Sequence, residues 1–368
     1  MTGTAMQLQS LIDAMETIAP TRFAEPWDNV GLLVGDPQQP VSRVLLTIDY
    51  TRAVAEEGKR LGCDAVIAYH PVIFDPLKRI VAGSVVYDAL RRGVAIWSPH
   101  TALDVADGGT NDMLADALAL VDRQPLKPAE TRDREYKLIT FVPREHVDQV
   151  ADALFAAGCG HIGQYTHCSF RSEGQGTFFG QEGTNPTVGQ AGRLETADEI
   201  RLETVVPIAQ LPQALQALRR SHPYEEPAFD LVRLAAPPEG HGIGRIGKVP
   251  GEATAEMLIN LLKRELELDR VLVAGDTSNI VRRVAVCAGA CGKLLEEARR
   301  QKVDLYVTGE LRHHDALAAA QAGMTVVCTL HSNSERKVLA RLQKRLKELL
   351  PSLPTHISEA DRDPFAVV

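Results

Sequence analysis

The chain has 368 residues, of which 45% are hydrophobic, which is enough for two or three domains with well-filled cores. Its formal net charge of −8 argues against a dominant phosphate-binding face, so nucleic acid is not expected as a main partner. No run approaches the ~20 apolar residues that span a bilayer, and no signal-peptide pattern opens the chain, so we expect a cytoplasmic protein without a membrane partner.

The first part of the chain alternates strand and helix patterns. Short apolar runs predict strands at 41–48, 65–68 and 94–97, and amphipathic segments predict helices at 53–61 and 85–92. Such alternation is typical of an α/β protein with a mostly parallel sheet.

The middle of the chain follows another pattern. Proline-containing segments at 125–135 and 235–240 look like linkers. Between them the expected order is strand 137–142, helix 146–157, two strands around a glycine-rich stretch, strand 200–206, helix 211–221 and strand 228–234. This order predicts an inserted ferredoxin-like α+β domain.

The βα pattern then returns. The expected elements are helix 253–266, strands 271–274 and 281–288, helix 293–301, strand 304–307, helix 316–322, strand 325–328 and helix 333–349. We therefore expect two α/β halves, residues 1–127 and 237–368, separated by an insert at 128–236.

Polar segments follow several predicted strands. They are 68–71, 99–104, 308–314 and 331–335, and they carry histidine, aspartate and glutamate side chains. Because ligands bind at the carboxyl ends of strands in open α/β sheets, these groups could converge on one site. Their chemistry points to a metal centre.

Each of these residues also has a structural interpretation. His70, before a proline, could be a buried histidine bonded to the backbone, and His100 and Asp104 could be turn formers. Ser332 and Glu335 fit a helix capping box, although His331 stands beside it at a strand end.

The absence of several well-known motifs argues against other activities. The chain has no P-loop, no strand-linked G-x-G-x-x-G and no Gly-x-Ser-x-Gly setting for an esterase nucleophile. The six cysteines are too scattered for a disulfide framework or a zinc ribbon, and we expect buried or incidental thiols, the near pair Cys287 and Cys291 included.

Taken together, the motifs resemble a known family. Segments 25–36, 69–74, 98–104, 308–310 with His314, and 331–335 look like the Nif-three-like family, whose members are often called GTP cyclohydrolase I type 2 homologues. Segments 136–143, 163–170, 176–178 and 222–227 are similar to the inserted domain of its longer bacterial members, itself similar to PII and CutA proteins.

The resemblance implies a toroidal homohexamer with a dinuclear metal centre in a cleft between the two α/β halves. Its ligands carry over to His70, Asp104, His331 and Glu335, with Glu335 bridging. Tyr69 stands where many bacterial members have another histidine, and a phenol with a pKa near 10 is a poor ligand at neutral pH. We therefore expect one or two divalent ions per subunit, whether Zn, Fe, Mn, Ni or Mg.

The resulting hypothesis is a metal-dependent hydrolase that acts on an unidentified nucleotide-like small molecule, with His100 and His314 as candidate general bases. The alternative is a non-catalytic metal-binding assembly or regulatory protein whose insert senses a ligand or docks a partner.

Overall fold

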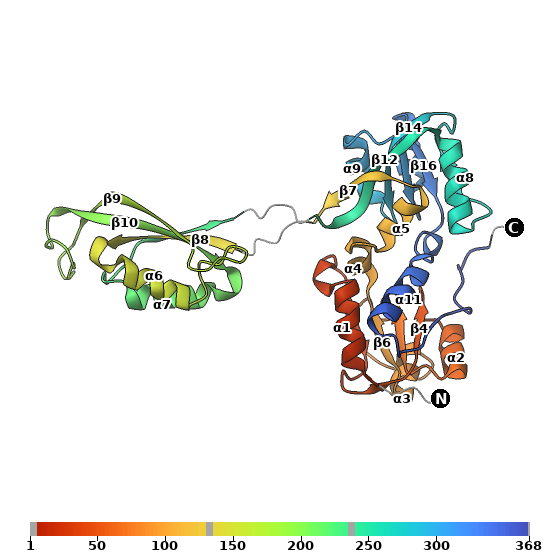
Figure 1. Cartoon of the computed structure of the whole chain (residues 1–368), viewed down its shortest axis with the longest axis horizontal. Coiled ribbons are helices and arrows are strands. Elements are labelled where there is room, and N and C mark those ends of the chain that lie inside the picture. The colour runs from red at the N-terminus through yellow and green to blue at the C-terminus, as the bar shows by residue number, and fades with distance from the viewer. Residues whose placement is uncertain (1–5, 130–134, 235–239, 367–368) are drawn as a thin grey trace. The chain divides into compact units, whose positions relative to one another are not determined.

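The computed structural model describes residues 6–129, 135–234 and 240–366. The chain is a mixed α/β protein with two compact units (Figure 1). The split unit contains residues 1–129 and 240–368, and the central unit contains residues 130–239. Within the described ranges no helix is both long and apolar enough to cross a membrane.

The first sheet of the split unit has five strands. Their order is β17 (Thr355–Ile357), β4 (Val44–Thr47), β5 (Ala65–Ala68), β6 (Ala95–Ser98) and β2 (Gly31–Val34). All neighbours are parallel except β2 and β6. Alternate residues point to opposite faces, so Leu45 and Val66 pack with α2 (Arg52–Leu61) and α3 (Val85–Arg92), whereas Leu46 and Ile67 join the core on the other face.

The second sheet of the split unit has six strands. Their order is β13 (Leu272–Ala274), β16 (Thr325–Cys328), β15 (Leu305–Thr308), β14 (Ile280–Cys287), β12 (Gly242–Thr254) and β7 (Val121–Pro128). The β14, β15 and β16 strands are parallel and the other pairs are antiparallel. On one face its side chains pack with α9 (Leu295–Arg300) and α10 (His313–Gln321).

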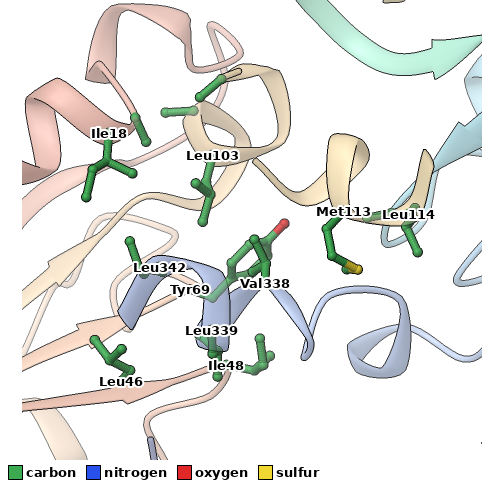
Figure 2. Packing of buried hydrophobic residues seen from close by; sticks show 14 of the residues in the cluster. Ile18, Leu46, Ile48, Tyr69, Leu103, Met113, Leu114, Val338, Leu339 and Leu342 are labelled. Atoms are coloured by element: carbon green, nitrogen blue, oxygen red, sulfur yellow. The ribbon is translucent and has the colours of Figure 1, made fainter. Parts of the chain in front are cut away.

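A shared hydrophobic core joins the two sheets. It receives side chains from both sheets and from α1 (Leu8–Ile18), α4 (His100–Val105), α5 (Thr110–Ala117), α8 (Ala255–Leu266) and α11 (Val338–Leu349). Figure 2 shows Tyr69 of the β5 end packed beside Val338 and Leu339 of α11. Burying each large apolar side chain contributes about 1.5–3 kcal/mol, so this core holds the two sheets as one unit.

Arg245 of β12 adds a buried polar link within the split unit. The residue is 4% exposed, and its guanidinium donates from Nε to Asp112 Oδ1 of α5 at 2.6 Å and from Nη2 to Oδ2 at 3.2 Å. The same guanidinium also donates to the carbonyl of Val105 at the end of α4. The arginine therefore fixes α4 and α5 against the second sheet.

The central unit has one antiparallel sheet. Its order is β11 (Phe229–Arg233), β8 (Glu135–Pro143), β10 (Leu194–Pro207) and β9 (Ser169–Phe179). The helices α6 (Val147–Ala156) and α7 (Leu211–Ser221) pack on one face through a separate core that includes Leu138, Val150 and Leu218. The other short elements of the chain are β1 (Met6–Gln7), β3 (Pro40–Val41) and the 3₁₀ turns η1 (Thr21–Phe23), η2 (Arg144–His146), η3 (Ile208–Gln210), η4 (Gly292–Leu294) and η5 (Ser332–Ser334).

The structure corrects several expected boundaries. The strand expected at 41–48 is divided into β3 and β4, and the helix expected at 333–349 begins only at Val338, after the η5 turn. Residues 125–128 of the first expected linker belong to β7, where they pair with β12. Residues 130–134 of that linker and 235–239 of the second lie outside the described ranges.

Candidate metal centre

Three side chains from distant parts of the split unit come together. His70 lies just after β5, His331 lies after β16, and Glu335 follows η5. One ligand atom of each lies within 4.8 Å of the corresponding atoms of the other two. We call these residues the His–His–Glu group, and they could hold a metal ion.

Both histidines are oriented by a second carboxylate. His70 Nδ1 lies 2.9 Å from Asp49 Oδ1, and His331 Nδ1 lies 3.3 Å from Glu310 Oε1. The opposite nitrogens face Glu335, with His70 Nε2 at 3.3 Å from Oε2 and His331 Nε2 at 3.4 Å from Oε1. Metal-binding histidines characteristically donate one ring nitrogen to a carboxylate and offer the other to the ion.

The facing atoms lack other partners. Glu335 is 3% exposed, and its Oε2 atom and His70 Nε2 are both buried without a hydrogen-bond partner among the described residues. Burial lowers the pKa of His70, but Asp49 and Glu335 outweigh this effect and raise it to about 10. Because unpaired buried polar atoms are costly, a cation between these atoms would satisfy both.

The backbone at Gly289 comes unusually close to this group. A Cβ at that position would lie 2.9 Å from Glu335 Oε1 and 3.4 Å from His331 Nε2, and the residue has a φ of +69°. Glycine therefore makes room for the carboxylate and the imidazole. The donor set, its orientation and this space fit a divalent cation.

Asp104 and Tyr69 form a separate buried pair. The Tyr69 hydroxyl donates to Asp104 Oδ1 and lies 3.1 Å from Thr110 Oγ1. Burial and the neighbouring Glu335 raise the pKa of Asp104 to about 6, although the Tyr69 hydrogen bond opposes the shift. Asp104, expected as a ligand, lies outside the His–His–Glu group, and its Oδ1 atom accepts the Tyr69 hydrogen bond.

The two candidate bases occupy different surroundings. The His100 ring centre lies 5.5 Å from that of His70, and its Nδ1 is 2.7 Å from Asp28 Oδ1. Burial raises the pKa of Asp28, but hydrogen bonds from His100 and Thr101 outweigh it and leave the pKa lowered. His314 is exposed on α10, and its ring contacts His313 rather than the His–His–Glu group.

Glu335 does not cap a helix. The η5 turn has no side-chain cap, and the Ser332 hydroxyl donates instead to Asp363 Oδ2 at 2.8 Å. The capping-box interpretation is therefore wrong.

Asp28, Asp49 and Glu310 have no role that their sequence segments predict. Asp49 lies two residues after β4 and Glu310 lies two residues after β15, so their position near strand ends was the available signal. Asp28 lies in the segment 25–36, before β2, and had no such signal.

The cysteine expectation holds in part. Cys63, Cys159 and Cys328 are buried free thiols and Cys168 is a partly exposed one. Cys287 and Cys291, expected as thiols, are joined by a disulfide, which the turn after β14 allows by bringing their Cα atoms to 6.0 Å.

Comparisons with known proteins cover almost the whole chain. The family described as Duf34/NIF3 (NGG1p interacting factor 3) matches residues 6–364. A Halalkalibacterium halodurans protein named GTP cyclohydrolase 1 type 2 homolog is 37% identical over 367 residues, 98% of each chain. Its namesake in Bacillus subtilis is 37% identical over 364 residues, 97% of each chain.

Two solved structures are also similar. A Bacillus cereus protein related to NIF3 has a TM-score of 0.69 at 34% identity, covering 99% of this chain and 100% of its own. A Staphylococcus aureus protein has a TM-score of 0.79 at 28% identity, covering 99% of each chain.

Proposed function

Since this chain belongs to the Duf34/NIF3 family, we propose that it is a metal-dependent hydrolase acting on a nucleotide-like small molecule. The observation that carries the proposal is the arrangement of His70 and His331, whose Nδ1 atoms each meet a carboxylate while their Nε2 atoms face Glu335. The name of the curated relatives, GTP cyclohydrolase 1 type 2 homolog, suggests the nucleotide-like class.

In this proposal His70, His331 and Glu335 hold the ion. A bound divalent ion supplies Lewis acidity and lowers the pKa of a bound water. Asp49 and Glu310 keep each imidazole in the tautomer with its proton on Nδ1, which leaves Nε2 as the ligand.

His100 is the general-base candidate that the geometry favours over His314. Asp28 holds the His100 Nδ1 atom, so its other ring nitrogen remains available to accept a proton near His70. Trp27 and Phe74 are 59% and 51% exposed, and their ring centres lie 6.1 and 6.5 Å from that of His100. These exposed rings offer flat apolar surfaces on which a planar base could stack.

We further propose that Tyr69 weakens any second ion position. The neutral phenol is engaged with Asp104, and burial followed by the nearby carboxylates raises its pKa well above the ordinary value. One tightly held ion per subunit is therefore expected.

The assembly and the central unit are also proposals. The family resemblance suggests a homohexamer, and the antiparallel sheet with two helices suggests a PII/CutA-like insert. A cavity in the central unit favours the competing function, a metal-binding regulatory protein that senses a ligand. Light scattering of the purified protein tests the hexamer.

Turnover measurements test the hydrolase. The purified protein is loaded with one defined metal at a time and is assayed against a panel of nucleotides and phosphoesters. We expect metal-dependent turnover that is lost in Glu335→Gln and kept in Glu252→Gln, an exposed carboxylate on β12. Tight metal binding without turnover on any panel member would favour the regulatory function.

A further inference from the structure

The central unit contains a cavity on the face of its sheet opposite the helices. Its volume is about 530 Å³, and its floor is formed by β8, β9 and β10. Ile200 and Leu202 point into the core beneath α6 and α7, so Glu199 and Arg201 point to the other face. Arg201 is paired with Phe141 on one side and Ser172 on the other, which places all three on the cavity floor.

Two segments cover this floor. Residues 180–188 fold back over the sheet and meet the segment 223–228, where Thr187 Oγ1 donates to the carbonyl of Pro223 at 2.8 Å. The amide of Asn185 also donates to Glu225 Oε1 at 3.3 Å. The cavity is therefore built by packed and hydrogen-bonded chain and is more than a dip in an exposed sheet.

Glycines keep the floor open. A Cβ at Gly176 would lie 2.3 Å from Glu199 Oε2, so the Glu199 carboxylate occupies space that any larger side chain at position 176 would fill. Gly174 is paired with Glu199 across the strands, and a Cβ there would meet nothing within 4 Å. The space above both glycines belongs to the cavity.

The charged groups give the cavity a negative character. Glu199 is partly buried and forms no ion pair with any residue in the described ranges. Arg201, the cation of the lining, is already paired through Nε with Glu203 Oε1 at 2.8 Å. Glu225 and Glu226 add further carboxylates at the cover. Because Glu199 has no cationic partner among the described residues, a cationic ligand would gain an ion pair with it.

Aromatic rings line the same space. Phe141, Phe178 and Tyr224 all contribute to it. The Tyr224 hydroxyl is buried beside Glu199, and burial followed by that carboxylate raises the pKa of the phenol. Aromatic faces beside a carboxylate attract organic cations, because the ring quadrupole and the charge act in the same sense.

We propose that this cavity binds a small organic ammonium ion with an apolar body, whose charged group meets Glu199 and whose apolar part lies against Phe141, Phe178 and Tyr224. The ligand site is separate from the His–His–Glu group in residues and in chemistry. Its occupant would make the central unit a sensor of an amine.

Matched pairs of probes test the proposal on the full chain. Isothermal titration compares benzylamine with benzyl alcohol, and 1,5-diaminopentane with 1,5-pentanediol, at neutral pH. We expect saturable binding of an amine at about one per chain, at least tenfold tighter than its alcohol. Glu199→Gln should weaken binding at least tenfold, and Gly174→Leu, whose side chain projects into open cavity space, should abolish it.

Glu182→Gln is the matched control, because this exposed carboxylate lies in the covering segment but does not line the cavity. It should leave binding unchanged, and circular dichroism should show that all variants are folded. Equal binding of amines and alcohols, or amine binding that survives both Glu199→Gln and Gly174→Leu, would overturn the proposal. The absence of saturable binding at millimolar amine would also overturn it. If, in that case, Gly174→Leu changes the oligomeric state, the cavity receives a second copy of the chain instead.

Discussion

The three carboxylates around the two histidines should contribute unequally to metal affinity. Glu335 faces both Nε2 atoms and is 3% exposed, so Glu335→Gln removes a ligand charge that water cannot replace. Asp49 stands behind His70 at 2.9 Å, and loss of such an outer carboxylate weakens metal binding about 10- to 100-fold, or about 1.4–2.7 kcal/mol. Glu310 is 47% exposed at 3.3 Å from His331, so water can take its place and Glu310→Gln should cost less than tenfold.

Competition with a chromogenic chelator measures these affinities for Zn²⁺ and Mn²⁺. The pH is held fixed, since protons compete for the imidazoles. The expected order of loss is Glu335→Gln, then Asp49→Asn, then Glu310→Gln, with Glu252→Gln unchanged. Wild-type affinity in Glu335→Gln, or a larger loss in Glu310→Gln than in Asp49→Asn, would refute the reasoning that the two imidazoles share one ion.

Four further outcomes are expected. Arg245→Met should lower the free energy of unfolding in urea by about 3 kcal/mol because it leaves the partly buried Asp112 carboxylate without its cation, whereas Lys248→Met, from an exposed pair, should cost at most ~1 kcal/mol. Burial lowers the pKa of His222, whose Nδ1 accepts a hydrogen bond from a backbone amide, so the unfolded chain binds the proton more readily than the folded chain. The stability of the central unit should therefore fall as the pH drops below about 6.5. Hydrogen exchange of the central unit should show this loss, and His222→Gln should reduce it. Replacing residues 130–239 by a short linker should leave metal affinity unchanged within a few-fold, and complete loss of metal from a folded product would contradict this. Tyr69→His should raise the metal content measured by mass spectrometry from one ion per chain towards two.

Regular elements were predictable where the pattern was local. The strands at 65–68 and 325–328 and the helix at 85–92 match because an apolar run or an amphipathic repeat determines them. The structure of the segment after His331 was not predictable, because Ser332 and Glu335 match a helix-capping pattern that tertiary contacts override. There the Glu335 carboxylate turns toward the histidines, and the helix begins later.

Site residues at strand ends could be proposed, but their partners could not. Asp49 lies 21 positions from His70, and Asp28 lies 72 from His100, so only the folded sheets bring each carboxylate to its imidazole. The same limit applies to Asp104, since nothing in its own segment indicates that Tyr69 engages its carboxylate.

The strands on either side of the central unit pair with one another, and this has a consequence for the order of folding. Pro128 of β7 is paired with Gly242 of β12, so closing this contact in an unfolded chain must enclose more than 110 residues. Tyr136 and Arg233, near the ends of the central unit, are themselves paired, so prior folding of that unit shortens the loop to about 20 residues. Since closure entropy grows with the logarithm of loop length, the shortening lowers the closure cost by about 1.5 kcal/mol. A chain whose central unit folds first would therefore nucleate the β7–β12 edge of the second sheet roughly tenfold more readily.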